Sequence, residues 1–93
     1  PNKRSGTSIY YYYPQAKPLA SHIITTMTAQ LGINNDKIYQ KSFAVVRNTS
    51  ALSILIEIGY LINPEDNAKM IEKSFQKNTA KAIADGIENF FKN

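Results

Sequence analysis

The chain has 93 residues, a formal net charge of +4 at pH 7, 43% hydrophobic residues and 19% charged residues. This composition predicts one globular domain and excludes a disordered or fibrous chain. There is no cysteine, which excludes disulfides and thiolate metal sites, and no apolar segment reaches the ~18–20 residues of a membrane-spanning helix. The positive charge suits an anionic partner such as nucleic acid, a membrane surface or an anionic polymer, without choosing among them.

The N-terminal part of the chain contains a tyrosine-rich segment. Residues 1–6 are polar and rich in turn formers, so we expect a mobile lead-in. The next segment, Thr7 to Tyr13, is uncharged and has high β-propensity, which predicts a strand. Its four consecutive tyrosines have two interpretations: the rings cover the edge of the core, or they form a stacking surface for bases or sugars.

After a connector at residues 14–18, an amphipathic helix is predicted up to the stop signal at Gly32. Its apolar residues recur at helical spacing and are Leu19, Ile23, Met27 and Leu31. His22 lies inside this helix with no other His, Asp or Glu at ligand spacing, so it is poor evidence for a metal site. Residues 33–37 contain Asn and Asp side chains typical of turns and predict a loop.

A second short apolar run, residues 43–46, predicts a buried strand that ends at Arg47. The guanidinium of Arg47 has the geometry to pair with a carboxylate. That carboxylate belongs either to a neighbouring strand or to a ligand, and both alternatives stay open at this point.

The segment from Ile54 to Ile62 is apolar and rich in β-branched residues, which predicts a strand buried on both faces. Glu57 interrupts it. A buried carboxylate destabilises a protein unless it is paired, hydrogen-bonded, bound to a metal or protonated. In open α/β sheets, ligands bind beyond the carboxyl ends of the strands, and Glu57 lies near that end. Glu57 is therefore either a functional carboxylate or the structural partner of an Arg or Lys.

Two helices are predicted after this strand. Asn63 can cap the first of them, and Pro64 suits its first position. This helix is expected to end near Glu72, and a longer one is expected from Ser74 to Lys92. The inner stripe of the longer helix is expected to consist of Phe75, Thr79, Ala82, Ile83, Ile87, Phe90 and Phe91.

Three pieces of the chain, in this order, match one family. They are G-T-S-I-Y-Y-Y at residues 6–12, F-A-V-V-R at 43–47 and I-L-I-E-I-G-Y-L-I-N-P-E-D at 54–66. The chain thereby resembles the zinc-dependent N-acetylmuramoyl-L-alanine amidases, bacterial cell-wall hydrolases that cut the amide between the lactyl group of N-acetylmuramic acid and the first L-alanine of the stem peptide. The segment A-I-A-D-G-I-E-N-F-F at 82–91 also looks like the family's final helix. Two positions depart from the family: Leu52 stands where Pro is usual, and Ile62 where Ser is usual.

The resemblance implies an α/β fold with a three-layer-type mixed sheet and flanking helices, here a partial domain of about three strands and three helices. Residues 1–93 would form the C-terminal half of a single amidase catalytic domain. Glu57 would be the catalytic carboxylate, placed beside a zinc-bound water to take its proton and pass it to the leaving nitrogen. Arg47 and Asn63 would support the site.

The resemblance also bears on the metal. The family's zinc ligands, two histidines and a glutamate, come from motifs of its N-terminal half that this chain lacks. His22 follows the tyrosine segment inside a helix and cannot be one of these ligands. We therefore expect zinc to be the cofactor of the intact domain, and the chain alone to hold no zinc and to be inactive.

The resemblance implies peptidoglycan as the substrate of a secreted or cell-wall-associated protein, with no membrane insertion and no nucleic-acid partner. Without the other half, strand edges and apolar surface would be uncovered, so the chain is expected to self-associate. The alternative is a complete small basic α/β module whose tyrosines and positive charge bind single-stranded nucleic acid. That alternative gives no reason for Glu57.

Overall fold

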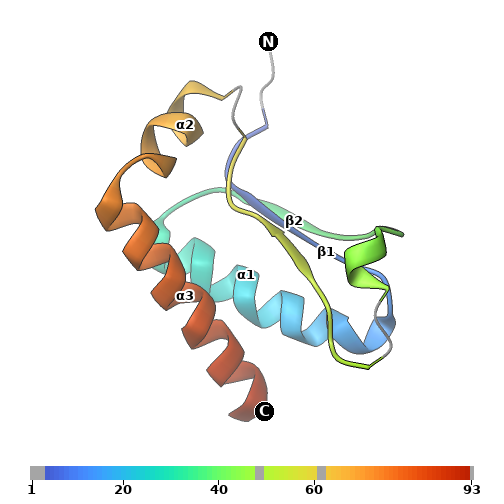
Figure 1. Ribbon diagram of the computed structural model, residues 1–93. Helices are drawn as coiled ribbons and strands as arrows, with labels where there is room; N and C mark the ends of the chain where they lie inside the picture. The colour runs from blue at the N-terminus through green and yellow to red at the C-terminus, as the bar shows by residue number, and fades with distance from the viewer. Residues whose placement is uncertain (1–3, 48–49, 61–62, 93) are drawn as a thin grey trace.

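The computed structural model describes residues 4–47, 50–60 and 63–92 (Figure 1). In chain order their elements are β1 (Thr7–Tyr11), the 3-10 turn η1 (Pro14–Ala16), α1 (Lys17–Leu31), β2 (Asn35–Gln40), the 3-10 turn η2 (Ala44–Val46), β3 (Leu55–Glu57), α2 (Pro64–Met70) and α3 (Lys73–Lys92). Residues 1–3 of the expected lead-in and residues 61–62 of the predicted strand lie outside the described residues.

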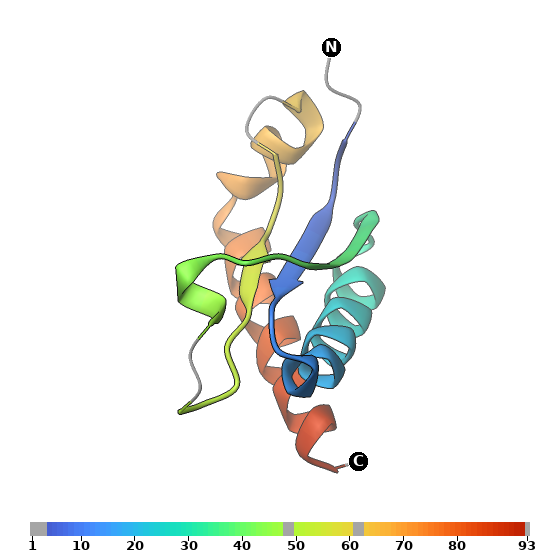
Figure 2. The same cartoon turned by 90° about the vertical axis from the view of Figure 1, so that its right-hand side faces the viewer.

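The strands form one mixed sheet in the order β2-β1-β3. β1 pairs parallel with β2 and antiparallel with β3. Helix α1 makes the crossover that two parallel neighbours require. In Figure 2, β1 and β3 lie between α1 on one side and the segment around η2 on the other. The predicted α/β fold with a mixed sheet is confirmed.

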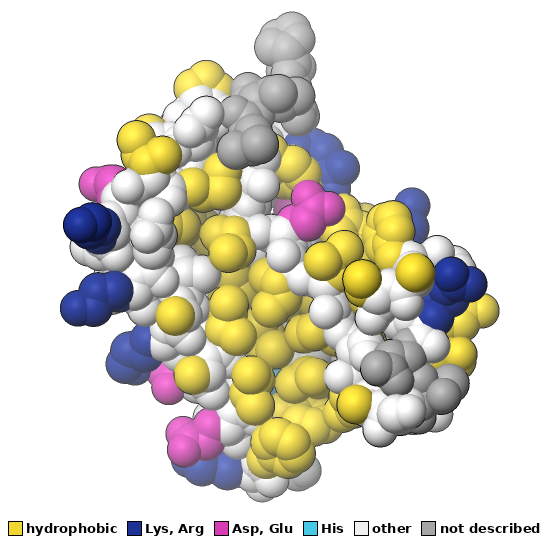
Figure 3. Space-filling model, in the orientation of Figure 1, with side chains coloured by type: hydrophobic (Ala, Val, Ile, Leu, Met, Phe, Trp, Pro, Cys, Tyr) yellow, Lys and Arg dark blue, Asp and Glu magenta, His cyan; other side chains and the backbone are white. Residues whose placement is uncertain are grey.

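The unpaired side of β3 adjoins exposed apolar residues. Among the described residues, β3 pairs with β1 alone. Leu52 and Ile58, which flank β3 in the sequence, are 42% and 37% exposed. Figure 3 shows apolar side chains gathered in the middle of this view, between α3 and the segment around η2. The part of the chain that the structure describes therefore leaves a strand edge and an apolar surface uncovered.

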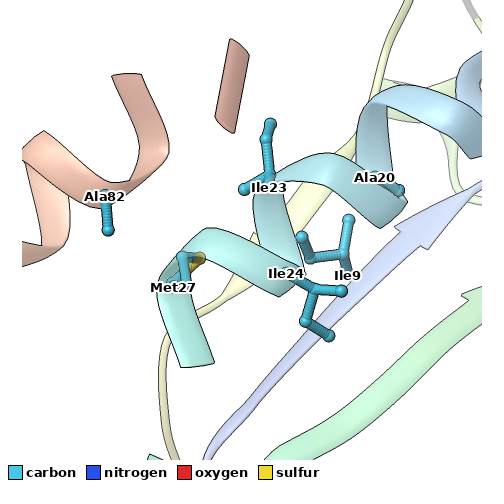
Figure 4. Packing of buried hydrophobic residues seen from close by; sticks show 6 residues of the cluster. All are labelled: Ile9, Ala20, Ile23, Ile24, Met27 and Ala82. Atoms are coloured by element: carbon cyan, nitrogen blue, oxygen red, sulfur yellow. The ribbon is translucent and has the colours of Figure 1, made fainter. Parts of the chain in front are cut away.

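The core lies between the sheet and helices α1 and α3 (Figure 4). Its fully buried members are Ile9 of β1, Ala20, Ile23, Ile24 and Met27 of α1, and Ala82 of α3. Ile38 of β2 and Ile56 of β3 pack against this cluster from the other two strands. All three strands thus turn one face toward the helices. The apolar stripe of α1 packs against this face, as its helical spacing predicts.

Helices α1 and α3 approach closely because α3 presents small residues at their contact. A Cβ on Gly86 would lie 2.6 Å from the Cα of Ile23, so only glycine fits there. The Thr26 hydroxyl also donates to the carbonyl oxygen of Ala82 at 2.6 Å. The predicted stripe of α3 is correct at Thr79 and Ala82, but Phe91 is 76% exposed and Gly86 is a buried residue that the apolar pattern missed.

The helix signals of the sequence are confirmed at two ends. Gly32 follows α1 in the left-handed conformation, with φ 64°. Asn63 caps α2 by accepting hydrogen bonds from the N–H groups of Glu65 and Asp66, and Pro64 takes the first helical position. No helix in the described ranges is long and apolar enough to cross a membrane.

The loop predicted at residues 33–37 is wrong in part, because β2 begins at Asn35. The turn chemistry itself is present: the Asn35 side chain accepts a hydrogen bond from the Lys37 N–H at 2.7 Å, and Lys37 has φ 80°. This turn shifts the register between Thr7 and Ile9 of β1, so it forms a bulge inside the strand rather than a loop.

The strand predicted at residues 43–46 is also wrong, because residues 44–46 form the 3-10 turn η2. Both sides of β1 are already occupied by β2 and β3. Only Val46 of this run is buried, while Val45 is 63% exposed and Phe43 packs its ring against Tyr10. In the described part of the chain, residues 44–46 therefore pair with no strand of the sheet.

Candidate active site

Glu57 is the last residue of β3, in a strand much shorter than the predicted one. It pairs with Ser8 of β1, and its carbonyl oxygen accepts a hydrogen bond from the Thr7 hydroxyl at 2.7 Å. Because Ile56 packs toward the core, strand alternation turns the Glu57 side chain to the other face of the sheet. Glu57 is half-buried. The prediction of a strand buried on both faces is therefore wrong, since all three residues of β3 are only partly buried.

The antiparallel direction of β3 bears on the functional interpretation of Glu57. β3 is antiparallel to β1, so Glu57 lies at the carboxyl end of its own strand but near the amino ends of β1 and β2. The rule that ligands bind beyond the carboxyl ends applies to parallel strands. The strand-end rule therefore gives no support to a functional Glu57, and the residues around Glu57 become the relevant observation.

Neither Glu57 nor Arg47 takes part in an ion pair with another described residue. Arg47 is exposed at the end of η2, where its N–H donates to the carbonyl oxygen of Ala44. The interpretation of Glu57 as the structural partner of Arg47 thus has no support in the described part of the chain.

A polar network lies beside Glu57 on the same face of the sheet. The cross-strand neighbour of Glu57 is Ser8, whose hydroxyl lies 3.3 Å from the Tyr60 hydroxyl. Tyr60 donates to Asp36 Oδ2, and Arg4 donates to the same oxygen through Nε at 3.0 Å and Nη2 at 2.6 Å. The Arg4 guanidinium also lies 4.8 Å from the centre of the Tyr60 ring. Arg4 and Asp36 therefore neutralise each other next to the segment that carries Glu57.

Burial, followed by the hydrogen bond to Asp36, raises the pKa of Tyr60 to about 12. The hydrogen bond to Asp36 is also the main cause that raises the pKa of Arg4 above its ordinary value. Tyr60 is thus a neutral hydroxyl at neutral pH, and it acts as a hydrogen-bond donor to Asp36.

Asp66 and Asn63 hold the backbone around this network. The buried Asp66 carboxylate accepts hydrogen bonds from the N–H groups of Gly6 and Tyr60, each at 3.0 Å. The Asn63 side chain caps α2 through its oxygen and donates to the carbonyl oxygen of Arg4 at 3.0 Å. Both donor and acceptor groups of Asn63 are therefore used within the chain.

Sequence reasoning missed four members of this site. The local sequence places Arg4 in the lead-in and Asp36 in a loop. It places Tyr60 in the strand and Asp66 in the helix that follows it. Asp66 stands three residues after the cap Asn63, a spacing at which a carboxylate often folds back onto preceding N–H groups. That spacing is the one signal that points to Asp66.

Two rings of the tyrosine segment are buried and so do not provide a stacking surface, whereas the Tyr12 ring is 36% exposed. Tyr10 and Tyr11 are each 8% exposed. The Tyr10 ring stacks on Tyr39 at 5.6 Å and meets the edge of Phe43 at 5.4 Å. These rings pack within the protein, which agrees with the interpretation that they cover the core.

A pocket of about 410 Å³ opens elsewhere, between the segment after β1 and the segment before β3. Tyr13, Gln15, Leu52 and Ser53 are among the residues that line it. Leu55 pairs with Tyr10 and Glu57 with Ser8, so this pocket lies beyond the opposite end of β3 from Glu57. It is separate from the polar network.

The search for metal ligands covers the described residues. Across the described ranges, no group of three or more His, Cys, Asp or Glu side chains is placed to hold a metal ion. The His22 ring packs edge-on against Phe90 at 6.1 Å.

Comparisons with known proteins add a family and a set of structures. A family model described as N-acetylmuramoyl-L-alanine amidase matches residues 1–89. The chain is 28% identical over 90 residues to the probable cell wall amidase LytH of Staphylococcus saprophyticus, covering 97% of this chain and 31% of that protein. It thus spans about a third of the length of this curated relative.

Two solved structures share the fold over almost the whole chain. The N-acetylmuramoyl-L-alanine amidase AmiC2 of Nostoc punctiforme matches with a TM-score of 0.91 and 31% identity, over 100% of this chain and 53% of that one. The catalytic domain of the amidase CwlV from Bacillus (Paenibacillus) polymyxa matches with a TM-score of 0.87 and 30% identity, over 97% of this chain and 50% of that domain. These matches give no support to a nucleic-acid-binding module.

Proposed function

Because this chain belongs to the N-acetylmuramoyl-L-alanine amidase family, we propose that it forms part of a catalytic domain that hydrolyses the amide between N-acetylmuramic acid and L-alanine in peptidoglycan. The family model covers residues 1–89, and the chain corresponds to about half of the CwlV catalytic domain. In this proposal, residues 1–93 are the C-terminal half of the domain and depend on the other half for activity.

The observation that carries the proposal is the environment of Glu57. Its carboxylate is half-buried, has no ion-pair partner in the described part of the chain, and lies beside a network that already neutralises its own charges. A carboxylate of this kind can accept a proton from an attacking water and return it to the departing amide nitrogen. Glu57 is therefore the proposed general base and general acid.

Asn63 and Arg47 have different supporting roles in this proposal. Asn63 acts through the backbone, since it joins the start of α2 to Arg4 and thereby holds the segment after Glu57. The exposed guanidinium of Arg47 is available for a carboxylate of the substrate. Peptide stems and cell-wall polymers are anionic, which agrees with the net charge of +4.

The proposal also includes a zinc cofactor for the intact domain and a location at the cell wall. The described residues do not make a zinc site, so the zinc implied by the family resemblance would take its ligands from outside this chain. The relative LytH is named as a cell wall amidase. On that basis, the protein that carries this chain is proposed to be secreted and to act at the bacterial cell wall.

The uncovered β3 edge supports a further part of the proposal, which is self-association of the isolated chain. An exposed strand edge flanked by apolar side chains is a template for pairing with a second copy. Leu52 and Ile58 provide such flanks. In the intact domain, we propose that the other half covers this edge.

Replacing Glu57 by Gln in the natural full-length protein tests the function. The amide keeps the shape of the side chain but cannot take up and release a proton as a carboxylate does, so turnover on cell-wall material should fall by about 10²–10⁴. Glu72→Gln is the matched control, because Glu72 is exposed beyond α2. Unchanged turnover in Glu57→Gln, with product analysis showing the same cut amide, would refute the role of Glu57.

The same variant separates the catalytic role from a structural one. A carboxylate used for chemistry does not favour folding, so the melting temperature of Glu57→Gln should hold or rise. If Glu57 instead neutralised a buried cation, the substitution would cost roughly 3–5 kcal/mol of stability. Activity would then fall in step with unfolding.

A further inference from the structure

Few backbone hydrogen bonds of the sheet hold the strand end at which Glu57 lies. β3 contains three residues, Glu57 is the last of them, and β3 pairs with a single strand in the described part of the chain. The ends of short edge strands open readily, because few hydrogen bonds hold them. A catalytic carboxylate at such an end needs another anchor for its backbone.

Asp66 supplies an anchor that spans the end of the β1–β3 ladder. Its Oδ2 atom accepts the N–H of Gly6, just before β1, and the N–H of Tyr60, just after β3. Gly6 precedes Thr7, whose hydroxyl binds the Glu57 carbonyl oxygen. One buried carboxylate oxygen therefore joins the two segments that flank Glu57 and its partner strand. Asp66 is 7% exposed, so water competes little for these bonds.

Two glycines allow the backbone to come this close. A Cβ on Gly6 would lie 1.9 Å from the carbonyl oxygen of Asn34, and Gly6 has φ +89°. A Cβ on Gly59 would lie 3.2 Å from the Cβ of Asp66 and 3.1 Å from Met70 Sδ. The turn after Glu57 is thus packed directly onto Asp66 and α2.

We propose that Asp66 is a positioning residue that fixes the backbone at Glu57 by holding the N–H groups of Gly6 and Tyr60 together. This inference rests on the proposed function, because it gives Glu57 the catalytic role. Asp66 itself does not touch substrate in this account. Its role differs from that of Glu65, the neighbouring acid in the first turn of α2, which is exposed and contributes charge to the helix end.

The first measurement is peptide-resolved hydrogen exchange on the natural full-length protein. In Asp66→Ala the peptides that contain Gly6 or Tyr60 should exchange on the order of 10–100-fold faster, as expected for the loss of hydrogen bonds to a charged group. Asp66→Asn loses the charge but keeps an acceptor oxygen, so its exchange should lie much closer to the parent than that of Asp66→Ala, and the control Glu65→Asn should match the parent. If Asp66→Ala does not fold, Asp66→Ser replaces it, with the same expected direction.

The second measurement is steady-state turnover of the folded fraction of the same variants. Misplacement of Glu57 should lower kcat in Asp66→Ala by on the order of 10², with KM and the shape of the pH profile unchanged. Asp66→Asn should recover most of kcat. If charge at the helix end were the role of Asp66, Asp66→Asn and Glu65→Asn would both lose activity and Asp66→Asn would not recover, which would overturn the inference.

The Glu57→Gln variant distinguishes the two proposals. Loss of turnover in Glu57→Gln together with parental kcat in Asp66→Ala would overturn the role of Asp66 and leave the proposed function intact. Parental turnover in Glu57→Gln would refute the proposed function. Parental exchange of the Gly6 and Tyr60 peptides in Asp66→Ala would then refute the anchor independently of any activity.

Discussion

Tyr60 and Asp36 connect the two outer strands of the sheet: the Tyr60 hydroxyl, in the segment after β3, donates a hydrogen bond to Asp36 Oδ2 on β2. The bond passes beside Ser8 of the central strand, whose hydroxyl lies 3.3 Å from that of Tyr60. Because Asp36 also binds Arg4, one carboxylate links the start of the chain, β2 and the segment that follows Glu57. The hydrogen bond between the segment after β3 and Asp36 depends on the Tyr60 hydroxyl.

Tyr60→Phe should therefore destabilise the protein. The substitution keeps the ring under Arg4 but removes the hydroxyl that Asp36 and the fully buried Ser8 share. The expected loss is about 1–3 kcal/mol of unfolding free energy. Chemical denaturation measures it, with Tyr12→Phe as control because the Tyr12 ring is 36% exposed. Equal effects of the two substitutions would contradict this account.

The contribution of Tyr60 should also depend on pH. Its pKa is raised from the ordinary 10.0 to about 12 in the folded protein. The neutral form is thus favoured by folding, so the stabilisation is fully present below pH 10 and is lost as pH rises through 12. The difference in unfolding free energy between the parent and Tyr60→Phe should be constant from neutral pH to about pH 9 and should shrink above pH 10. A difference that grows above pH 10 would have the wrong sign.

Gly6→Ala should be much more destabilising than Gly32→Ala. Both glycines have positive φ, at 89° and 64°, but an added Cβ meets Asn34 O at 1.9 Å only in the first case and open space in the second. We expect about 1–2 kcal/mol for Gly32→Ala from backbone strain alone. For Gly6→Ala we expect at least about 3 kcal/mol, since displacement of Asn34 adds to the strain. Thermal melting of the two variants under identical conditions compares them.

The 93-residue chain alone should hold no stoichiometric zinc and should release no stem peptides. A zinc site takes three or four side-chain ligands, and the described residues offer no such group. Isothermal titration with zinc checks this, with His22→Ala as control for weak binding to the lone histidine. One tight zinc site per chain would contradict this prediction. His22 and Glu57 would then be the first residues to substitute in a search for the ligands.

The isolated chain should form dimers or larger species through the β3 edge. Ile58→Lys places a charge beside this edge and should shift the population toward monomer. Ile71→Lys is the matched control, because Ile71 is 74% exposed at the end of α2 and lies away from the sheet. Sedimentation over a wide concentration range measures both. A compact monomer at every concentration would contradict the uncovered edge as an association site.

Local patterns predicted the parts of this protein that depend on neighbours in the sequence. The spacing of apolar residues identified α1 and α3, Gly32 and Asn63 marked helix ends, and β-propensity located β1. The unusual acid in an apolar segment drew attention to Glu57, and the resemblance carried by residues 54–66 identified the family. Each of these signals is contained within a few turns of helix or a single strand.

Only the tertiary structure decided the length of β3, the strand at residues 35–40, the turn at 44–46 and the network around Glu57. Whether an apolar run becomes a strand depends on its pairing with a sheet edge, and residues 44–46 pair with none of the described strands. Arg4 and Asp36 lie far in the sequence from Tyr60 and Asp66, and nothing in their local sequence marks Arg4, Asp36 or Tyr60 as part of a network. Long-range hydrogen bonds bring these side chains together. A buried polar group without a hydrogen-bond partner destabilises the fold, so each buried side chain has to find its partner in the folded chain.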